Sequence, residues 1–185
     1  MNPDQIAVFK EKVQSKSKTI KSIQTDFTQK KKMDFLENEI TSKGQMMQSA
    51  EGFLKWQYTE PNMYSIIFKS NQIHINDNGK KSTKNVDQRR FKKISALVSG
   101  SIKGDMFSDA EFSYSFYKRG GDVVVKLITK EKTIMKYIKS IELTFPKEEV
   151  MVSEVKLIEP SGDYTLISFK NRKINVPIHK AAFNH

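Results

Sequence analysis

The sequence predicts an α+β fold in which one amphipathic helix precedes a large antiparallel sheet. Apolar residues recur at helical spacing near the N-terminus, and from residue 23 onward they alternate with polar ones, as in strands. The intervals between alternating runs are too short for the helices that parallel strands require. A length of 185 residues suits one domain, so we expect a single domain over residues 1–185.

The helix is expected from the spacing of its apolar side chains, with lysines on the remaining face and Asp4 as a cap or first-turn anion. Its apolar stripe consists of Ile6, Phe9, Val13, Ile20 and Ile23. A second helical interval is expected over residues 87–107, where apolar residues again fall at helical spacing. Because Gly100 and Gly104 interrupt it, we expect two short helices there.

Strands are expected wherever apolar and polar residues alternate, beginning at Ile23, Thr25 and Phe27. The further runs are 40–47, 53–58, 64–68, 73–76, 112–117, 123–128, 134–145, 150–158 and 164–169. Turn-forming residues separate several of them, as at Asp77-Asn78-Gly79. The pattern therefore predicts a meander of hairpins that curls toward a barrel.

Composition excludes several classes of protein. No run approaches the ~18–20 apolar residues that span a bilayer. Cysteine is absent, which removes disulfides, thiolate–metal sites and Cys nucleophiles. The three histidines are scattered, and neither an acid pair nor a nucleophile elbow stands out. We therefore expect no enzyme, no catalytic residues and no metal site.

The basic charge admits more than one interpretation. Lys and Arg total 32 against 21 Asp and Glu, for a net charge of +11. Basic clusters at residues 30–32 and 89–93 suit a solvated surface, a surface that steers the protein to a membrane or partner, or a nucleic-acid contact. Because acidic residues are interspersed throughout, nucleic acid is the least favoured of the three.

The apolar strand faces are the most informative feature, because a large curled sheet either fills its interior or leaves room for an apolar ligand. The aromatic and aliphatic residues on these faces are Leu54, Trp56, Tyr58, Tyr64, Ile66, Phe68, Phe112, Tyr114 and Phe116. A packed core and a ligand cavity both remain open on this pattern alone.

Several segments, in order, resemble the periplasmic outer-membrane lipoprotein carrier family (LolA-like). They are residues 23–29 (IQTDFTQ), Gly44, residues 54–61 (LKWQYTEP), residues 158–169 (IEPSGDYTLISF), and then Asn171, Asn175, Ile178 and Phe183. The family often has an Arg-Pro pair before the Trp strand, where this chain has Ala50 and Glu51. Control of a lid by that arginine therefore cannot be carried over.

The resemblance implies a half-open antiparallel β-barrel with a helical lid, which shields lipoprotein acyl chains during transfer from the inner to the outer membrane. It also implies a periplasmic protein whose signal peptide has been removed, an inner-membrane ABC transporter complex, an outer-membrane acceptor and no cofactor. A monomer that binds no nucleic acid is expected. The expected acyl-chain cavity is lined by Phe27, Met46, Leu54, Trp56, Tyr58, Tyr64, Ile66, Phe68, Phe91, Ile94, Leu97, Phe112, Tyr114 and Phe116.

The alternative hypothesis is a basic interaction module with a filled barrel that binds nucleic acid or an acidic partner. Binding to DNA that weakens steeply with salt would favour the module. Binding of an apolar probe that is insensitive to salt would favour the carrier.

Overall fold

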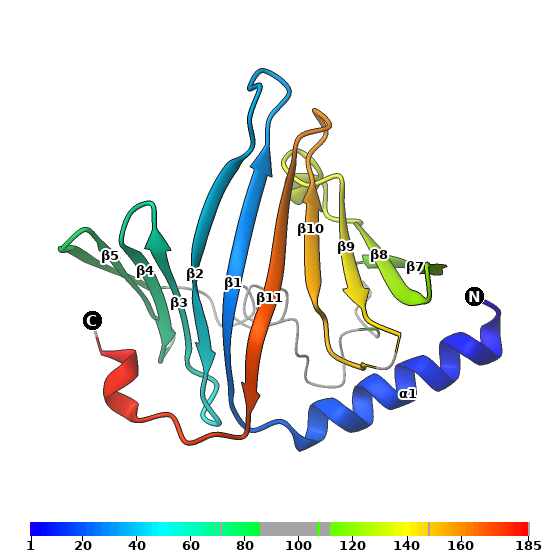
Figure 1. The fold of residues 1–185 in the computed structure, drawn as a ribbon, viewed down its shortest axis with the longest axis horizontal. Coiled ribbons are helices and arrows are strands. Elements are labelled where there is room, and N and C mark those ends of the chain that lie inside the picture. The colour runs from blue at the N-terminus through cyan, green and yellow to red at the C-terminus, as the bar shows by residue number, and fades with distance from the viewer. Residues whose placement is uncertain (71, 86–106, 108–111, 148, 185) are drawn as a thin grey trace. The chain divides into compact units, whose positions relative to one another are not determined.

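A long N-terminal helix precedes the strands in the computed structural model of the chain, which describes residues 1–70, 72–85, 107, 112–147 and 149–184 (Figure 1). The helical elements are α1 (Pro3–Thr19), α3 (Lys132–Met135) and the 3₁₀ helix η1 (Lys180–Phe183). The strands are β1 (Ile23–Lys32), β2 (Ile40–Gln48), β3 (Leu54–Glu60), β4 (Tyr64–Lys69), β5 (Gln72–Asp77), β6 (Lys80–Asn85), β7 (Phe112–Arg119), β8 (Asp122–Thr129), β9 (Ser140–Phe145), β10 (Glu154–Ile158) and β11 (Tyr164–Ile174).

The strands form one 11-stranded antiparallel sheet in the order β6-β5-β4-β3-β2-β1-β11-β10-β9-β8-β7. The N-terminal strand β1 thus lies beside the C-terminal strand β11 (Figure 1). Since the order of the described strands begins at β6 and ends at β7, these strands do not close into a barrel. The predicted α+β class with an antiparallel, unclosed sheet is confirmed.

The chain divides into two compact units, which are described separately. The first comprises residues 1–19, 29–41 and 100–168, and the second comprises residues 20–28, 42–99 and 169–185. The expectation of one domain over residues 1–185 stays a prediction.

In the first unit, reciprocal hydrogen bonds begin helix α1. The Gln5 amide donates to Asn2 Oδ1 at 2.9 Å, and the Asn2 amide donates to Gln5 Oε1 at 3.2 Å. This is the geometry of a capping box, so Asn2 caps the helix and Asp4 is the first-turn anion. Phe9, which is 8% exposed, packs its ring edge-on against Phe145 with centroids 5.0 Å apart.

In the second unit, side chains and backbone join the residues after β11 to the start of β1. The Lys21 amide donates to Asn175 Oδ1 at 2.7 Å, and the Ser22 hydroxyl donates to the Val176 carbonyl at 2.6 Å. Near the C-terminus, Phe183 is 1% exposed and packs against Phe53 with ring centroids 5.9 Å apart.

Three sequence predictions need correction. Ile20 and Ile23 do not belong to the helix, because α1 ends at Thr19 and Ile23 opens β1. The expected run 134–145 is helix α3 followed by the shorter strand β9, and the run 150–158 is a strand only from Glu154. Strand β6 was not predicted, because its sequence KKSTKN has no apolar alternation.

The helical interval expected at 87–107 lies outside the described residues, apart from Phe107. Among the helices that are described, none is long and apolar enough to cross a bilayer.

Candidate functional site

The site is built on one face of strands β1 to β4 in the second unit, which we call the apolar face. Cross-strand register aligns its residues, since residues directly opposite one another in antiparallel strands share a face. Trp56 of β3 lies opposite Met46 of β2 and Ile66 of β4. The apolar face comprises Phe27, Met46, Leu54, Trp56, Tyr58, Tyr64, Ile66 and Phe68. The structure thus brings eight of the predicted cavity residues together on one face.

An aromatic cluster forms the centre of the apolar face. Phe27 stacks on Trp56, with ring centroids 4.0 Å apart and planes at 23°. Tyr58 and Phe169 meet these rings edge-on, at 5.3 Å from Phe27 and 6.2 Å from Trp56 respectively. Gly44 makes room for the cluster, because a Cβ there would lie 2.6 Å from Phe27 Cζ. Sequence comparison pointed to Gly44, and this close approach is the physical reason for a glycine.

Burial falls along the apolar face from β2 toward the sheet edge. Met46, Leu54 and Trp56 are at most 5% exposed. Tyr64 and Ile66 on β4 are only half-buried, and so are all of the β5 residues except Asp77. The accessible end of the face therefore lies toward β4 and β5.

The remaining predicted cavity residues fall into two groups. Phe112, Tyr114 and Phe116 alternate along β7 in the first unit, where the Phe116 ring lies 6.2 Å from Phe9 of helix α1. Phe91, Ile94 and Leu97, predicted for the lid, lie outside the described residues.

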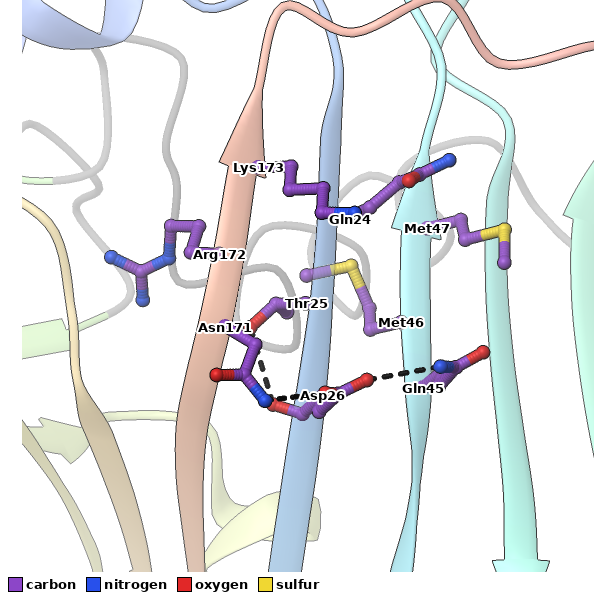
Figure 2. Close-up of a pocket in the computed structure, with 9 residues that line it drawn as sticks. All are labelled: Gln24, Thr25, Asp26, Gln45, Met46, Met47, Asn171, Arg172 and Lys173. Carbon is purple, nitrogen blue, oxygen red and sulfur yellow. Dashed lines mark hydrogen bonds between the residues drawn. The ribbon is translucent and has the colours of Figure 1, made fainter.

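A pocket of about 600 Å³ opens among β1, β2 and β11, and sequence reasoning missed it (Figure 2). Its centre is the Asp26 carboxylate, which accepts hydrogen bonds from Gln45 Nε2 at 3.0 Å and Asn171 Nδ2 at 2.8 Å. The other lining residues are Gln24, Thr25, Met46, Met47, Arg172 and Lys173. Asp26 alternates with Phe27 along β1, so its side chain points away from the apolar face. Asp26, Gln45 and Asn171 offer hydrogen-bonding groups to a ligand, whereas Met46 and Met47 add an apolar part to the lining.

Charged contacts outside these surfaces support the scaffold of the first unit. A hydrogen bond from Tyr164 to Glu39, 2.9 Å long, lowers the pKa of Glu39 below its ordinary value. A hydrogen bond from Arg119 to Glu142, at 3.1 Å, raises the pKa of Arg119. Among the described residues, no three His, Asp or Glu side chains gather as metal ligands do. The Arg119–Glu142 contact is an ion pair, and the Tyr164–Glu39 contact is a hydrogen bond.

The positions where the family often has Arg-Pro lie in the turn between β2 and β3. Ala50 and Glu51 are both exposed there. The Glu51 carboxylate lies 3.8 Å from Lys180 Nζ. A backbone hydrogen bond and one from Ser49 lower the pKa of Glu51.

Comparison with known protein families shows the family to which the chain belongs. The profile of the family described as "Outer membrane lipoprotein carrier protein LolA" matches residues 18–185. The chain belongs to this family. Two of the residues that carry the LolA resemblance, Asn171 and Asn175, have positive φ angles of 54° and 58°, a conformation in which Asn is enriched. No curated protein matches the sequence.

Solved structures share the fold at low sequence identity. A LolA superfamily protein from Nitrosomonas europaea has a TM-score of 0.50 and 10% identity, with 95% of this chain and 97% of that one covered. Lipoprotein LppX from Mycobacterium tuberculosis has a TM-score of 0.52 and 10% identity, with 97% of this chain and 99% of that one covered. A chain of the Pseudomonas aeruginosa MucA/MucB complex has a TM-score of 0.54 and 9% identity, with 95% of this chain and 59% of that one covered. These likenesses establish the LolA-like fold.

Proposed function

We propose that this protein is a periplasmic carrier that shields the acyl chains of lipoproteins on its apolar face during transfer from the inner to the outer membrane. The observation that carries the proposal is a continuous row of aromatic and aliphatic side chains on one sheet face of a LolA-family chain. An inner-membrane ABC transporter complex would supply the cargo, and an outer-membrane acceptor would receive it. The chain itself supplies a binding surface and no chemical step.

The energetics of the apolar face suit a carrier that must also unload. Removing an acyl chain from water gains ~0.8 kcal/mol per methylene, or roughly 12 kcal/mol for about 15 carbons. Without cargo, Phe27 and Trp56 already bury each other by stacking. Cargo that reaches these rings must replace contacts that the rings already make. The net binding free energy is therefore the free energy gained by burying the acyl chain minus the free energy lost when these contacts break. Release then costs far less than the gross transfer free energy.

The half-buried end of the apolar face offers the sharpest test by mutation. Ile66 and Ser65 are consecutive half-buried residues of β4 whose side chains point to opposite faces. Ser65 lies opposite Gln57 and Asn76, on the face of the sheet away from Ile66. Ile66→Glu places a carboxylate where hydrocarbon would lie, whereas Ser65→Glu makes the same charge change on the other face.

The experiment titrates delipidated protein with an acylated peptide and follows the fluorescence of Trp56, with native mass spectrometry of the complex. We expect Ile66→Glu to weaken binding at least tenfold and Ser65→Glu to change it less than about twofold, with thermal unfolding of both variants measured in parallel. Ile66→Ala, which adds no charge, is expected to retain most of the binding. An unchanged Trp56 spectrum together with no bound acyl peptide would refute the proposal.

A further inference from the structure

We infer that the apolar face binds lipids with a negatively charged headgroup, which Lys84 and Ser82 contact at the edge strand β6. This inference rests on the proposed function, because it specifies the class of lipid that the apolar face would take. Among the described strands, β6 is the last of the sheet on this side, and all six of its residues are exposed.

The strand register connects the apolar face directly to β6. One row runs across the strands from Trp56 through Ile66 and Ile75 to Ser82. The next row runs from Leu54 through Phe68 and Ile73 to Lys84. Both rows therefore begin with buried apolar side chains on β3 and end with a polar side chain on β6. From β3 to β6, three strand spacings of about 4.8 Å give a path of about 14 Å.

The change from apolar to polar side chains along each row matches the two parts of an amphiphile, a hydrocarbon tail and a polar headgroup. A hydrocarbon tail that lies along the rows meets Ile73 and Ile75, which are half-buried. A headgroup at the end of the rows meets the Lys84 ammonium and the Ser82 hydroxyl, which are both donors to an oxyanion. Because an ammonium group is a compact point charge, it favours a carboxylate or phosphate over a neutral or cationic headgroup.

Among the described residues of the second unit, no acidic side chain lies opposite Lys84 or forms an ion pair with it. Glu51 and Glu60 lie 3.8 Å and 2.9 Å from the lysine ammonium groups of Lys180 and Lys43. Asp77, on the same face as Lys84, stands directly opposite Lys80. The residue opposite Lys84 is the apolar Ile73. Lys84 thus faces an apolar neighbour across the strand, whereas Lys80 faces an acid.

Lys81 provides a matched control on the same strand. It lies opposite Asn76, and therefore on the other face of the sheet from Lys84. Lys81→Gln and Lys84→Gln remove the same charge from the same exposed strand. Lys84→Arg keeps the charge at the proposed headgroup site.

The test compares myristate with its uncharged glycerol ester, both below their aggregation concentrations, by titration of delipidated protein. We expect wild type to bind myristate about fivefold more tightly than the ester, which corresponds to the upper end of the free energy of an exposed charge pair. Lys84→Gln should bring the two affinities together, whereas Lys84→Arg and Lys81→Gln keep the preference. Added salt should reduce the preference in wild type.

Three outcomes would overturn the inference. Equal affinity of wild type for the two lipids refutes the charged-headgroup preference and leaves the proposed carrier function standing. An equal loss of preference in Lys81→Gln and Lys84→Gln shows a general attraction by the basic protein, with no site at Lys84. Binding of neither lipid refutes the inference, and the titration with the acylated peptide decides the proposed function separately.

Discussion

Substitution of Gly44 tests the packing of the apolar face, because Gly44 is where the backbone of β2 approaches the aromatic cluster. An alanine Cβ at this position would meet the backbone oxygen of Gln57 and lie 2.6–2.8 Å from two ring atoms of Phe27. Overpacking of this kind costs about 1–3 kcal/mol. A carbonyl oxygen in a sheet cannot swing aside as a side chain can, so we expect the upper end, about 3 kcal/mol. The lower chain entropy of unfolded alanine offsets about 1 kcal/mol of this cost.

Gly44→Ala should therefore lower the free energy of unfolding by about 2 kcal/mol net, from a total of about 5–15 kcal/mol for a typical domain. Urea unfolding followed by Trp56 fluorescence measures this change, since Trp56 stacks on Phe27. The double variant Gly44→Ala/Phe27→Leu should show a coupling in which less is lost than the sum of the two single changes. Thr41→Ala, exposed on the same strand, is the control. A neutral or stabilising Gly44→Ala would refute the packing described here.

Two further predictions concern the first unit. Phe9→Ala removes the ring that helix α1 packs against Phe116 and Phe145, and should lower the free energy of unfolding by about 3–5 kcal/mol. Val8→Ala, at a side chain that is 51% exposed, should change it by less than about 0.5 kcal/mol, and similar losses in both would contradict the packing of α1. Tyr164→Phe removes the hydrogen bond that lowers the pKa of Glu39, so that pKa should rise in an NMR titration. Because the folded-state pKa is lowered, the stabilisation is present above the unfolded-state pKa of Glu39 and is lost as the pH falls through the folded-state value. The stability difference between wild type and Tyr164→Phe should shrink accordingly at acid pH, and a difference that persists unchanged there would contradict this assignment.

Sequence patterning predicted the parts of the fold in which burial is one-sided. Ile23, Thr25 and Phe27 alternate with polar residues, and the structure buries all three. Strand β6 escaped prediction because both of its faces are exposed, so that no apolar period marks it. It is a strand only because β5 pairs with it along six residues. Pairing of this kind is a tertiary effect that local sequence does not encode.

Of the candidate site, the apolar face was predictable from the sequence and the pocket around Asp26 was not. Alternation predicted Trp56 and Tyr58 on one side of β3, and the register places Met46 and Ile66, which were also predicted, opposite Trp56. The pocket around Asp26 was not predictable, because the hydrogen bonds of Asp26 reach residues 19 and 145 positions away in the sequence. The headgroup position at Lys84 likewise depends on the register between β5 and β6.

The most direct test of the central claim is photocross-linking with an acylated peptide that carries its reactive group in the acyl chain. Mass spectrometry of the cross-linked protein then identifies the residues in contact with the hydrocarbon. The account predicts adducts on the accessible end of the apolar face, at Tyr64, Ile66, Ile73 or Ile75. Adducts confined to the opposite face, at Gln57, Ser65 or Asn76, would contradict it.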